Sequence, residues 1–320
     1  MVPIFGDRAA RSPFSATVHD SGGTLYRDGH AIAEFDFPKT PRFYAESTSD
    51  GIPYWKIATL HSHDVLATTV LQHCVRYGDR KTSCQFCAIG ESLKAERTIA
   101  RKRPEQLAEV AEAAVRLDGV THMVMTTGTP ATADRGAAIL SASARAVRAR
   151  VDLPIQAQCE PPDDPAWFGR MRNAGIDTLG MHVEAVTPEV RTRIMPGKAE
   201  VSVEGYITAF QQAVEVFGRG QVTTYILAGL GDTPESILAF CGRVVPMGVY
   251  PFVVPFVPVQ GTPLADAPPP SVTLMSEIIR PLAALLAEHG LRSQDIRAGC
   301  GRCGACSTLR GIERLRVEAT

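Results

Sequence analysis

The regular alternation of strand-like and helix-like segments is the feature that most constrains the fold of this chain. Parallel strands joined by right-handed helical crossovers are the expected result of six such units in series. The sequence therefore predicts an α/β fold, built either as an open doubly wound sheet or as a full or partial barrel. The apolar runs of strand length are residues 65–71, 121–125, 155–159, 178–183, 222–227 and 250–258. The helical patterns are residues 104–117, 135–151, 164–173, 203–217, 234–245 and 272–289, the last with an expected break at Pro281.

A group of three cysteines directly follows the first predicted strand, where functional residues of such folds are found. Cys74, Cys84 and Cys87 have the spacing C-x9-C-x2-C. Thiolates gathered on one loop favour iron or zinc. Three ligands suit a [4Fe-4S] cluster that keeps one iron free for a substrate or cofactor. The alternative is a structural zinc loop, with a fourth ligand from the nearby histidines, which are His73, His61 and His63.

Polar and glycine-rich residues also follow the later strands. A row of polar side chains on the third strand is costly unless it faces a polar cavity, so we expect Gln158 and Glu160 to line a substrate pocket. His182 and Glu184 share one face at the end of the fourth strand. The remaining candidates at strand ends are Thr126, Thr127, Gly128, Gly229 and Gly261.

A second cysteine group lies near the C-terminus. Cys300, Cys303 and Cys306 are spaced C-x2-C-x2-C among glycines, a spacing that occurs in ferredoxin-type cluster loops. The sequence predicts an auxiliary iron-sulfur cluster there, and structural zinc is the alternative. We expect this group to reach the C-terminal rim of the strands, near the first cysteine group. Its fourth ligand is then Cys159, another side chain or the substrate.

Composition limits the class of protein and its partners. The 320 residues are 45% hydrophobic and 21% charged, which suits one large globular domain with a modest extension. A net charge of −1 and a pI near 6.7 give no electrostatic signal for DNA, RNA or acidic membranes. The N-terminal residues lack an apolar core of signal-peptide length, and no apolar span reaches 18 residues. We therefore expect a soluble cytoplasmic protein, whose clustered cysteines bind metal and do not form disulfides.

The first part of the chain has a different pattern from the rest. Short β-type runs flank Asp28 and Gly29, which form a two-residue turn signal for a hairpin. The predicted organisation is a β extension and linker at residues 1–58, a barrel at 59–290 and a C-terminal tail with an auxiliary metal site at 291–320.

The order of these motifs resembles the radical S-adenosylmethionine (SAM) superfamily, and within it the biotin synthase and lipoyl synthase branch. The usual cluster loop of that superfamily is C-x3-C-x-aromatic-C. Phe86 supplies the aromatic, whereas the first gap here is nine residues. Residues 261–264 match the end of that branch's strand-six run, in which Val254 and Phe256 replace Asn and Leu. Residues 41–309 look most like an uncharacterised radical SAM family of nitrilase-containing bacterial operons.

The resemblance implies a partial (β/α)6 barrel of the TIM type and assigns roles to particular residues. Cys74, Cys84 and Cys87 would ligate the [4Fe-4S] cluster, and Phe86 would lie beside the SAM adenine. Glu184 would accept hydrogen bonds from both ribose hydroxyls. Lys198 or Arg193 would pair with the SAM carboxylate, unless these two form ordinary surface ion pairs. The other positions implied in cofactor binding are Thr126, Thr127 and Gly128 at the amino group, His182, Gly229 and Gly261.

The implied reaction is reductive cleavage of SAM to a 5′-deoxyadenosyl radical that acts on a small molecule, by sulfur insertion or by rearrangement. A flavodoxin or ferredoxin would supply the electron, and neither nucleic acid nor membrane is an expected partner. The alternative is an iron-sulfur electron carrier or a metal-stabilised binding module without SAM chemistry.

Overall fold

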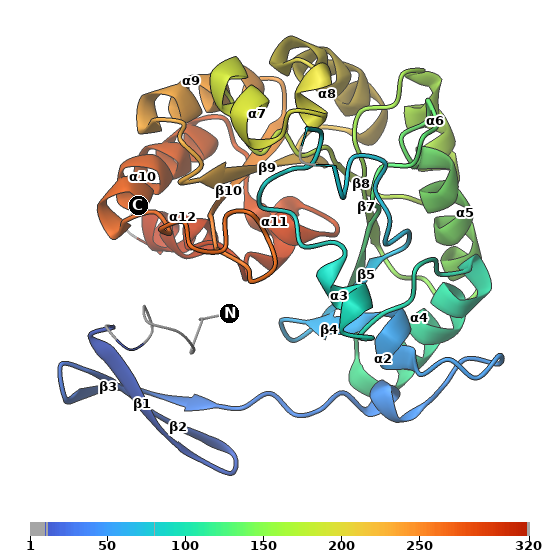
Figure 1. The fold of residues 1–320 in the computed structure, drawn as a ribbon, viewed down its shortest axis with the longest axis horizontal. Helices are drawn as coiled ribbons and strands as arrows, with labels where there is room; N and C mark the ends of the chain where they lie inside the picture. Colours follow the sequence, from blue (N-terminus) through green and yellow to red (C-terminus); the bar gives the residue numbers. More distant parts are fainter. Residues whose placement is uncertain (1–9, 11, 80, 319–320) are drawn as a thin grey trace. The chain divides into compact units, whose positions relative to one another are not determined.

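The computed structural model describes residues 10, 12–79 and 81–318 (Figure 1). The N-terminal residues for which the sequence predicts no signal peptide, 1–9, lie outside the described part. Contacts divide the chain into two compact units, Met1–Pro41 and Arg42–Thr320. No helix in the described part is long and apolar enough to cross a membrane.

The first unit contains a three-stranded antiparallel sheet. Its strands are β1 (Phe14–His19), β2 (Gly22–Arg27) and β3 (His30–Asp36), in the order β1-β2-β3. The predicted hairpin is confirmed, because β2 pairs with β3 across the Asp28-Gly29 turn. Both turn residues have positive φ, 50° and 81°, as a tight two-residue hairpin turn requires. β1 was not predicted.

The second unit is organised around a curled sheet with the order β10-β9-β8-β7-β6-β5-β4. The six strands from β5 to β10 are parallel, and β4 pairs antiparallel with β5. The predicted α/β partial barrel is therefore confirmed, with an additional edge strand. The strands are β4 (Thr59–His61), β5 (Val65–Thr69), β6 (His122–Thr126), β7 (Ile155–Gln158), β8 (Thr178–Gly180), β9 (Val222–Ala228) and β10 (Val249–Pro255).

Helices cover the outer face of this sheet (Figure 1). The long ones follow the predicted ranges closely, and α8 has the predicted bounds. α2, α3, α7, α11 and α12 were not predicted as helices. The helices are α2 (Tyr54–Ile57), α3 (Glu91–Lys94), α4 (Pro104–Asp118), α5 (Ala137–Arg148), α6 (Ala166–Asn173), α7 (Pro188–Ile194), α8 (Val203–Phe217), α9 (Pro234–Val244), α10 (Val272–Glu288), α11 (Cys300–Cys303) and α12 (Leu309–Glu318). Short 3-10 turns are η1 (Arg42–Ala45), η2 (Lys198–Glu200) and η3 (Ser293–Asp295).

The predicted break at Pro281 is wrong, because α10 continues through the proline. A proline inside a helix removes one backbone hydrogen bond and costs about 3 kcal/mol. The apolar face of α10 offsets that cost, since Ile278, Ile279, Leu282 and Leu286 are each at most 2% exposed. Fully burying one such side chain contributes roughly 1.5–3 kcal/mol.

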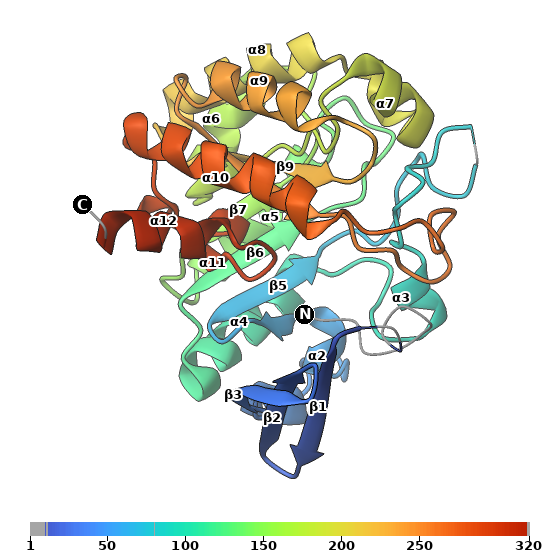
Figure 2. The same cartoon turned by 90° about the vertical axis from the view of Figure 1, so that its left-hand side faces the viewer.

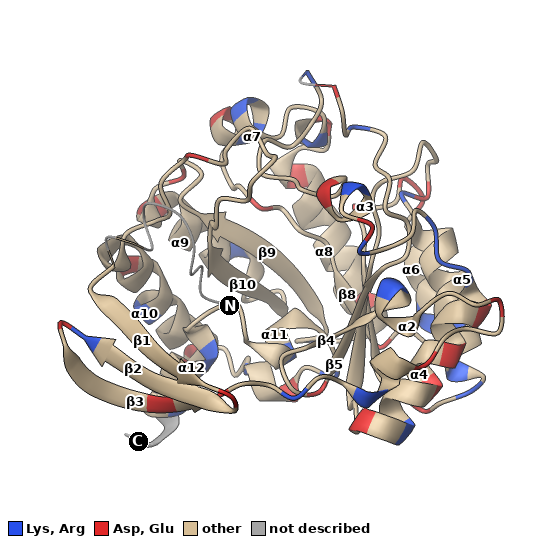
Figure 3. Ribbon diagram, turned by 60° about the horizontal axis from the view of Figure 1, so that its bottom comes forward, with Lys and Arg blue, Asp and Glu red and all other residues tan. Residues whose placement is uncertain are grey.

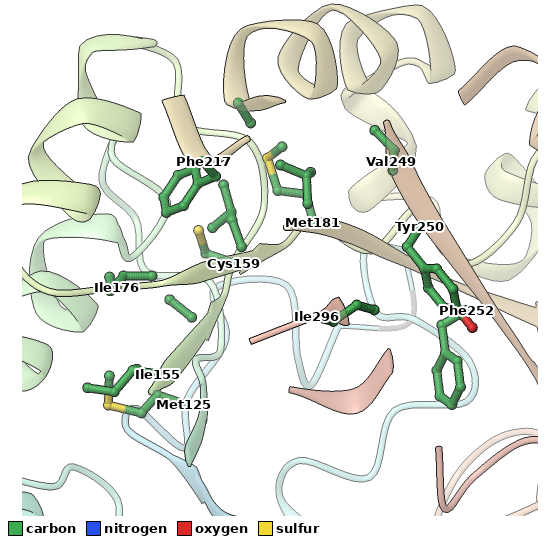
Figure 4. Packing of buried hydrophobic residues seen from close by; sticks show 14 of the residues in the cluster. Met125, Ile155, Cys159, Ile176, Met181, Phe217, Val249, Tyr250, Phe252 and Ile296 are labelled. Atoms are coloured by element: carbon green, nitrogen blue, oxygen red, sulfur yellow. The ribbon is translucent and has the colours of Figure 1, made fainter. Parts of the chain in front are cut away.

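The core consists of aliphatic and aromatic side chains from the strands and the helices that face them. Met125 and Ile155 on adjacent strands, Tyr250 and Phe252 on β10, and Phe217 at the end of α8 are among them (Figure 4). The barrel strands contain no Lys, Arg, Asp or Glu, as Figure 3 shows for β9 and β10. Charged groups near the barrel interior must therefore come from the connections between strands and helices.

The C-terminal tail enters the barrel interior at the N-terminal ends of the strands. Gly299 N donates to Nδ1 of His122, the first residue of β6, at 3.1 Å. Thr178, the first residue of β8, donates to the carbonyl oxygen of Ala298 at 3.0 Å. The predicted location at the C-terminal rim is therefore wrong. The physical reason is that α10 runs antiparallel to the strands, as crossover helices do, and so returns the chain to their N-terminal ends. There Arg219 donates to the carbonyl oxygen of His289 at 2.7 Å.

The tail also contacts both edge strands of the open sheet, β4 and β10. We call the unpaired side between β4 and β10 the seam. Ser307 donates to the carbonyl oxygen of Val253 on β10 at 2.6 Å, and Cys306 Sγ lies 3.9 Å from His61 Nε2 on β4. α12 then packs beside α10 (Figure 2). Tail side chains thus span the seam, where strand pairing would close a complete barrel.

Candidate functional site

A cavity of about 340 Å³ lies at the C-terminal ends of the barrel strands and gathers most of the predicted site residues. The loops after β5, β6, β7 and β8 supply its walls, as expected for parallel α/β folds. Predicted residues in its lining are Cys74, Cys84, Phe86, Cys87, Thr126, Thr127, Gly128, Gln158, Glu160, His182, Glu184 and Lys198. Lining residues that the sequence did not single out are Thr69, Gln72, Arg76, Ile89 and Thr129. Cys159, a candidate fourth ligand of the C-terminal cysteine group, also lines the cavity.

The cysteine loop is held against the barrel by backbone contacts. Gln85 N donates to the carbonyl oxygen of Ile194 at 2.8 Å, and Gly128 N donates to that of Leu71 at 2.8 Å. A Cβ at Gly128 would lie 2.0 Å from the carbonyl oxygen of His73. Only glycine therefore allows the loop after β6 to approach the cysteine loop this closely.

An apolar cluster fixes the far side of the same loop. Cys84 and Phe86 pack against it. Its members come from α7 and from the connections after β8, β9 and β10, and they are Ala185, Val190, Ile194, Met195, Leu230 and Phe256. The unpredicted helix α7 thus packs against the cysteine loop and supports it.

The three thiols of this loop share the cavity and influence one another's charge. Burial and, to a smaller extent, nearby Glu184 raise the pKa of Cys84 to about 12. Burial also raises the pKa of Cys87. Among the described residues, no three His, Cys, Asp or Glu side chains are close enough together to hold a single metal ion. Three soft donors around one cavity suit a cluster, whose ligands are spread over several iron atoms.

The histidines considered for a zinc loop are not all near these thiols. His61 ends β4, and His63 lies in the turn that precedes β5. Both therefore lie at the N-terminal ends of the parallel strands, whereas the cysteine loop follows the C-terminal end of β5. The prediction that they could complete a zinc site with Cys74, Cys84 and Cys87 is wrong, because the length of β5 separates them.

Glu184 and Lys198 form an ion pair at the cavity. Lys198 Nζ lies 2.7 Å from Glu184 Oε2, and the two side chains are only 12% and 16% exposed. Burial opposes the charge on Lys198, but Glu184, followed by Tyr206 and Glu160, raises the pKa of Lys198 above its ordinary value. Glu184 adopts a φ of 63°, an uncommon conformation for a non-glycine residue. Sequence reasoning placed both residues in the site but missed that they pair.

His182 presents a neutral imidazole to the cavity. Its Nδ1 accepts a hydrogen bond from Tyr225 N at 3.1 Å. Burial, with a smaller effect of Lys198, lowers the pKa of His182 to about 3. The proton of the neutral ring therefore resides on Nε2, which has no hydrogen-bond partner in the described part of the chain. His182 can donate one hydrogen bond to a bound molecule.

Glu160 is the centre of a second charged group. Its Oε1 accepts hydrogen bonds from Arg76 and, at 2.7 Å, from Thr129. Arg135 Nη1 lies 3.8 Å from Oε2, which makes no hydrogen bond among the described residues. Burial would raise the pKa of Glu160, but Lys198, Thr129 and Arg76 hold it below the ordinary value. Glu160 is therefore ionised at neutral pH, with one oxygen available.

Arg76 is the main site residue that sequence reasoning missed. It is 6% exposed and contacts both Glu160 and Glu200, the latter at 3.5 Å. Glu160 is 84 positions away along the chain, so no local pattern could reveal this pair. The only available signal was the position of Arg76 two residues after Cys74.

Three predicted cofactor residues do not line the cavity. Arg193, Gly229 and Gly261 are exposed. Arg193 Nη2 donates to the carbonyl oxygen of Leu230 at 3.0 Å. A Cβ at Gly261 would meet the carboxyl group of Glu91 at 2.5 Å, so this glycine allows its loop to pack on α3. A cofactor role for these three stays a prediction.

The second cysteine group lies beneath the cavity, and Gln158 connects the two. Gln158 lines the cavity and donates from Nε2 to Cys300 Sγ at 3.3 Å. Gln156 Oε1 accepts from both Gln158 Nε2, at 2.7 Å, and Cys300 N, at 3.2 Å. The Tyr225 hydroxyl interacts with Cys300 and Cys306, and burial together with these thiols raises the pKa of Tyr225 well above its ordinary value. The polar row of β7 thus faces the cavity at one end and the tail at the other.

Comparison with known proteins gives a family match over just over half of the chain. Residues 79–244 match the sequence model of the radical SAM superfamily. Three curated relatives match over shorter segments. Bacteriochlorophyllide c C-7(1)-hydroxylase of Chlorobaculum limnaeum is 29% identical over 160 residues, which cover 48% of this chain and 40% of that protein. Lipoyl synthase of Chlorobaculum parvum is 29% identical over 161 residues, which cover 49% and 51%.

A probable dual-specificity RNA methyltransferase of Moorella thermoacetica is 30% identical over 132 residues, which cover 39% of this chain and 35% of that protein. The chain thus spans about half or less of the length of these relatives.

Solved structures show the same fold at low sequence identity. Methylornithine synthase superposes with a TM-score of 0.54 and 20% identity, covering 78% of this chain and 69% of that one. A radical SAM methyltransferase from Sphaerobacter thermophilus gives 0.51 and 16%, covering 89% and 78%.

Proposed function

The chain belongs to the radical SAM superfamily, and from this premise we propose that it cleaves SAM at a [4Fe-4S] cluster held by Cys74, Cys84 and Cys87. When bound, such a cluster supplies the electron that converts SAM into methionine and a 5′-deoxyadenosyl radical. The observation that carries the proposal is the convergence of these three thiols on one cavity at the C-terminal ends of the strands. The polar groups that SAM requires line the same cavity.

The residues of this chain bind and orient SAM in the proposal. Glu184 accepts hydrogen bonds from the ribose hydroxyls, while Lys198 fixes its other carboxylate oxygen. Residues 126–128 offer hydroxyls and carbonyl oxygens to the amino group, and Phe86 packs beside the adenine. Lys198 is proposed to pair with the SAM carboxylate. Because Lys198 also forms an ion pair with Glu184, the two carboxylates would share its positive charge.

Glu160 and Gln158 form the proposed substrate side of the cavity. His182, which the resemblance assigns to cofactor binding, is proposed to serve this side as well. Glu160 offers a buried carboxylate oxygen, and His182 offers an N–H donor. Together they suit a small polar molecule that carries both a donor and an acceptor. The reaction is proposed to be a sulfur insertion or a rearrangement, as in the biotin synthase and lipoyl synthase branch. The assignment to the family of nitrilase-containing operons is likewise a proposal.

An auxiliary iron-sulfur cluster at Cys300, Cys303 and Cys306 completes the proposal, with zinc as the alternative. What supports it is the spacing of the three cysteines and the contact of one of them, Cys300, with Gln158 of the cavity lining. A flavodoxin or ferredoxin in the reducing cytoplasm would be the electron donor. The near-neutral charge of the chain supports a small-molecule substrate and not nucleic acid.

Anaerobic reconstitution with iron and sulfide, reduction with dithionite and chromatography for 5′-deoxyadenosine test this function. We expect the nucleoside to form from SAM with the wild-type chain. Its absence, with the first cluster intact by iron analysis, would contradict the proposal and leave an iron-sulfur carrier or metal-stabilised binding module.

A further inference from the structure

We propose that Arg191 is a positioning residue for SAM binding. Its guanidinium fixes the two loop segments that carry Glu184 and Lys198, the pair assigned above to the SAM ribose and carboxylate. This inference rests on the proposed function and adds the residue through which the fold holds that pair in place.

Arg191 is a buried cation beside the cavity wall. It lies on α7, is 1% exposed and is not among the residues that line the cavity. In the described part of the chain, its hydrogen-bond partners are all backbone carbonyl oxygens. The guanidinium also lies over the ring of Tyr206, 5.1 Å from the ring centroid. Carbonyl dipoles and an aromatic face thus compensate the cost of burying this charge.

The four carbonyl oxygens belong to two segments of the chain. Nη1 donates to the carbonyl oxygens of Val183, at 2.5 Å, and Ala185, at 3.3 Å, which flank Glu184. Nη2 donates to the carbonyl oxygens of Lys198, at 3.1 Å, and Val201, at 2.8 Å. One planar group therefore joins the connection after β8 to the segment around η2. Each member of the ion pair is attached to it through its own backbone or the residues next to it.

The backbone at Glu184 has a conformation that depends on its surroundings. A φ of 63° is uncommon for a non-glycine residue and persists only where neighbouring contacts hold it. Glu184 N donates to the carbonyl oxygen of Tyr225, and Leu227 N donates to that of Glu184, both at 2.8 Å. Arg191 fixes the next carbonyl group on either side. Without it, the peptide groups that flank Glu184 can rotate, and the carboxylate can leave the position that faces the ribose.

A guanidinium is suited to this role because one group must serve two segments. It presents five N–H donors in a rigid plane, whereas a lysine ammonium has three donors on a single nitrogen. Arg191→Lys keeps the positive charge but can hold one segment and not both. This variant therefore removes the link between Glu184 and Lys198 with little change in electrostatics.

The test is a double-mutant cycle on SAM affinity, with Arg191→Lys and Glu184→Gln in the reconstituted full chain. Arg219→Lys is the matched control. Arg219 also joins two segments through carbonyl oxygens, those of Pro246 and His289, but near the N-terminal ends of the strands. Iron analysis shows whether each variant retains its iron, and thermal unfolding shows whether it is folded.

We expect Arg191→Lys to weaken SAM binding about tenfold when Glu184 is present. In the Glu184→Gln background the same change should weaken binding by less than about threefold, because the carboxylate that Arg191 positions is then absent. Arg219→Lys should bind SAM as wild type does. A purely structural residue would have the same effect in both backgrounds, and this result overturns the inference. So does wild-type SAM affinity in Arg191→Lys or in Glu184→Gln.

A second variant keeps the test decisive if Arg191→Lys does not fold. Tyr206→Leu then takes its place in the cycle, because it removes the ring beneath the guanidinium and leaves the guanidinium itself. Tyr206→Phe is its control, since the Tyr206 hydroxyl has no hydrogen-bond partner in the described part of the chain. The same outcomes decide. A wild-type chain that forms no 5′-deoxyadenosine contradicts the proposed function, whereas equal effects in both backgrounds of an active chain contradict only the role of Arg191.

Discussion

Each buried charge at the cavity is held by a partner of opposite sign. Glu184 has Lys198, and Glu160 has Arg76 with Arg135 nearby. Removing one member of a buried pair leaves an uncompensated charge and costs several kcal/mol. Glu184→Gln also leaves the Lys198 charge without its partner, so the stability of this variant is measured beside its SAM affinity.

Glu184→Gln should weaken SAM binding by roughly 10- to 150-fold, with both metal sites retained. Hydrogen bonds to a charged acceptor contribute about 1.5–3 kcal/mol, which corresponds to that range. Equilibrium binding of SAM to the reconstituted protein measures the effect. Glu189→Gln, an exposed change on α7, is the control. Equal affinities in the two variants would show that Glu184 does not contact SAM.

Cys84→Ala should abolish 5′-deoxyadenosine formation and remove about four irons per chain. The fold should survive, because the barrel core does not include the cysteine loop. Cys241→Ala is the control, since Cys241 is fully buried in α9 and away from the cavity lining. Iron analysis and nucleoside chromatography make the measurement, and a Cys84 variant that still cleaves SAM would refute the ligand assignment.

His122→Asn should reduce the acid sensitivity of folding. Burial lowers the pKa of His122 to about 4. Between pH 6.5 and 4 the unfolded chain binds a proton that the folded chain does not, so the free energy of unfolding falls as the pH falls. The loss approaches about 3 kcal/mol at pH 4 and is absent above pH 6.5. Asparagine does not titrate, and its oxygen can still accept from Gly299.

Urea unfolding of wild type and His122→Asn at pH 4 to 7 measures this difference. His63→Asn, an exposed change, should follow the wild-type curve. Parallel curves for wild type and His122→Asn would show that His122 does not remain neutral in the folded chain.

At the scale of elements, the strands were predictable and the path of the tail was not. Runs rich in β-branched and aromatic residues, such as β9, identify buried parallel strands without further information. The short helix α7 has too few residues to show a helical period. The tail was predicted at the C-terminal ends of the strands but enters at their N-terminal ends, because its direction depends on where α10 returns the chain. His61 was expected near the first cysteine group for the same reason, since proximity in sequence did not reveal that it lies beside the N-terminal end of β5.

Gly299→Ala should release the tail from the barrel. Gly299 has a φ of +102°, and an added Cβ would lie 2.1 Å from the Gln156 side chain. Strain and overpacking together should cost roughly 2–5 kcal/mol. Hydrogen exchange of residues 299–306 measures the release. Gly290→Ala is the matched control, because its φ is +63° with no atom within 4 Å of the added carbon. Similar exchange in both variants would count against a docked tail.

At the scale of the whole molecule, the chain contains two units of unequal size. The hydrophobic core begins at Phe43, which lies in the second unit. The domain limits expected from the sequence, at residues 58 and 290, remain predictions. The first of them would assign η1 and α2 to the extension, although their buried side chains belong to the core of the barrel unit.

A chain that begins at Arg42 should fold and melt within about 3 °C of the full-length protein, since a change under 1 kcal/mol shifts Tm by only a few degrees at this size. A chain that begins at Ala58 should be strongly destabilised, because it loses Phe43, Tyr54 and Ile57 from the core. Calorimetry of both truncations makes the comparison. A large drop in Tm for the first truncation would show that the units depend on each other.

In a closed barrel, the width of the interior and the geometry at the C-terminal ends of the strands are fixed together. The tail across the seam makes these two properties independent of each other in this protein. In a ring of paired strands, the internal width follows from the strand number and tilt. Here Cys306 contacts the edge strand β4 and Ser307 contacts the edge strand β10. Substitutions in that short segment can therefore change the width of the barrel interior and the depth to which it is filled by the tail. The cavity at the C-terminal ends of the strands, which is built on other loops, would keep its geometry while the barrel interior below it changes in width.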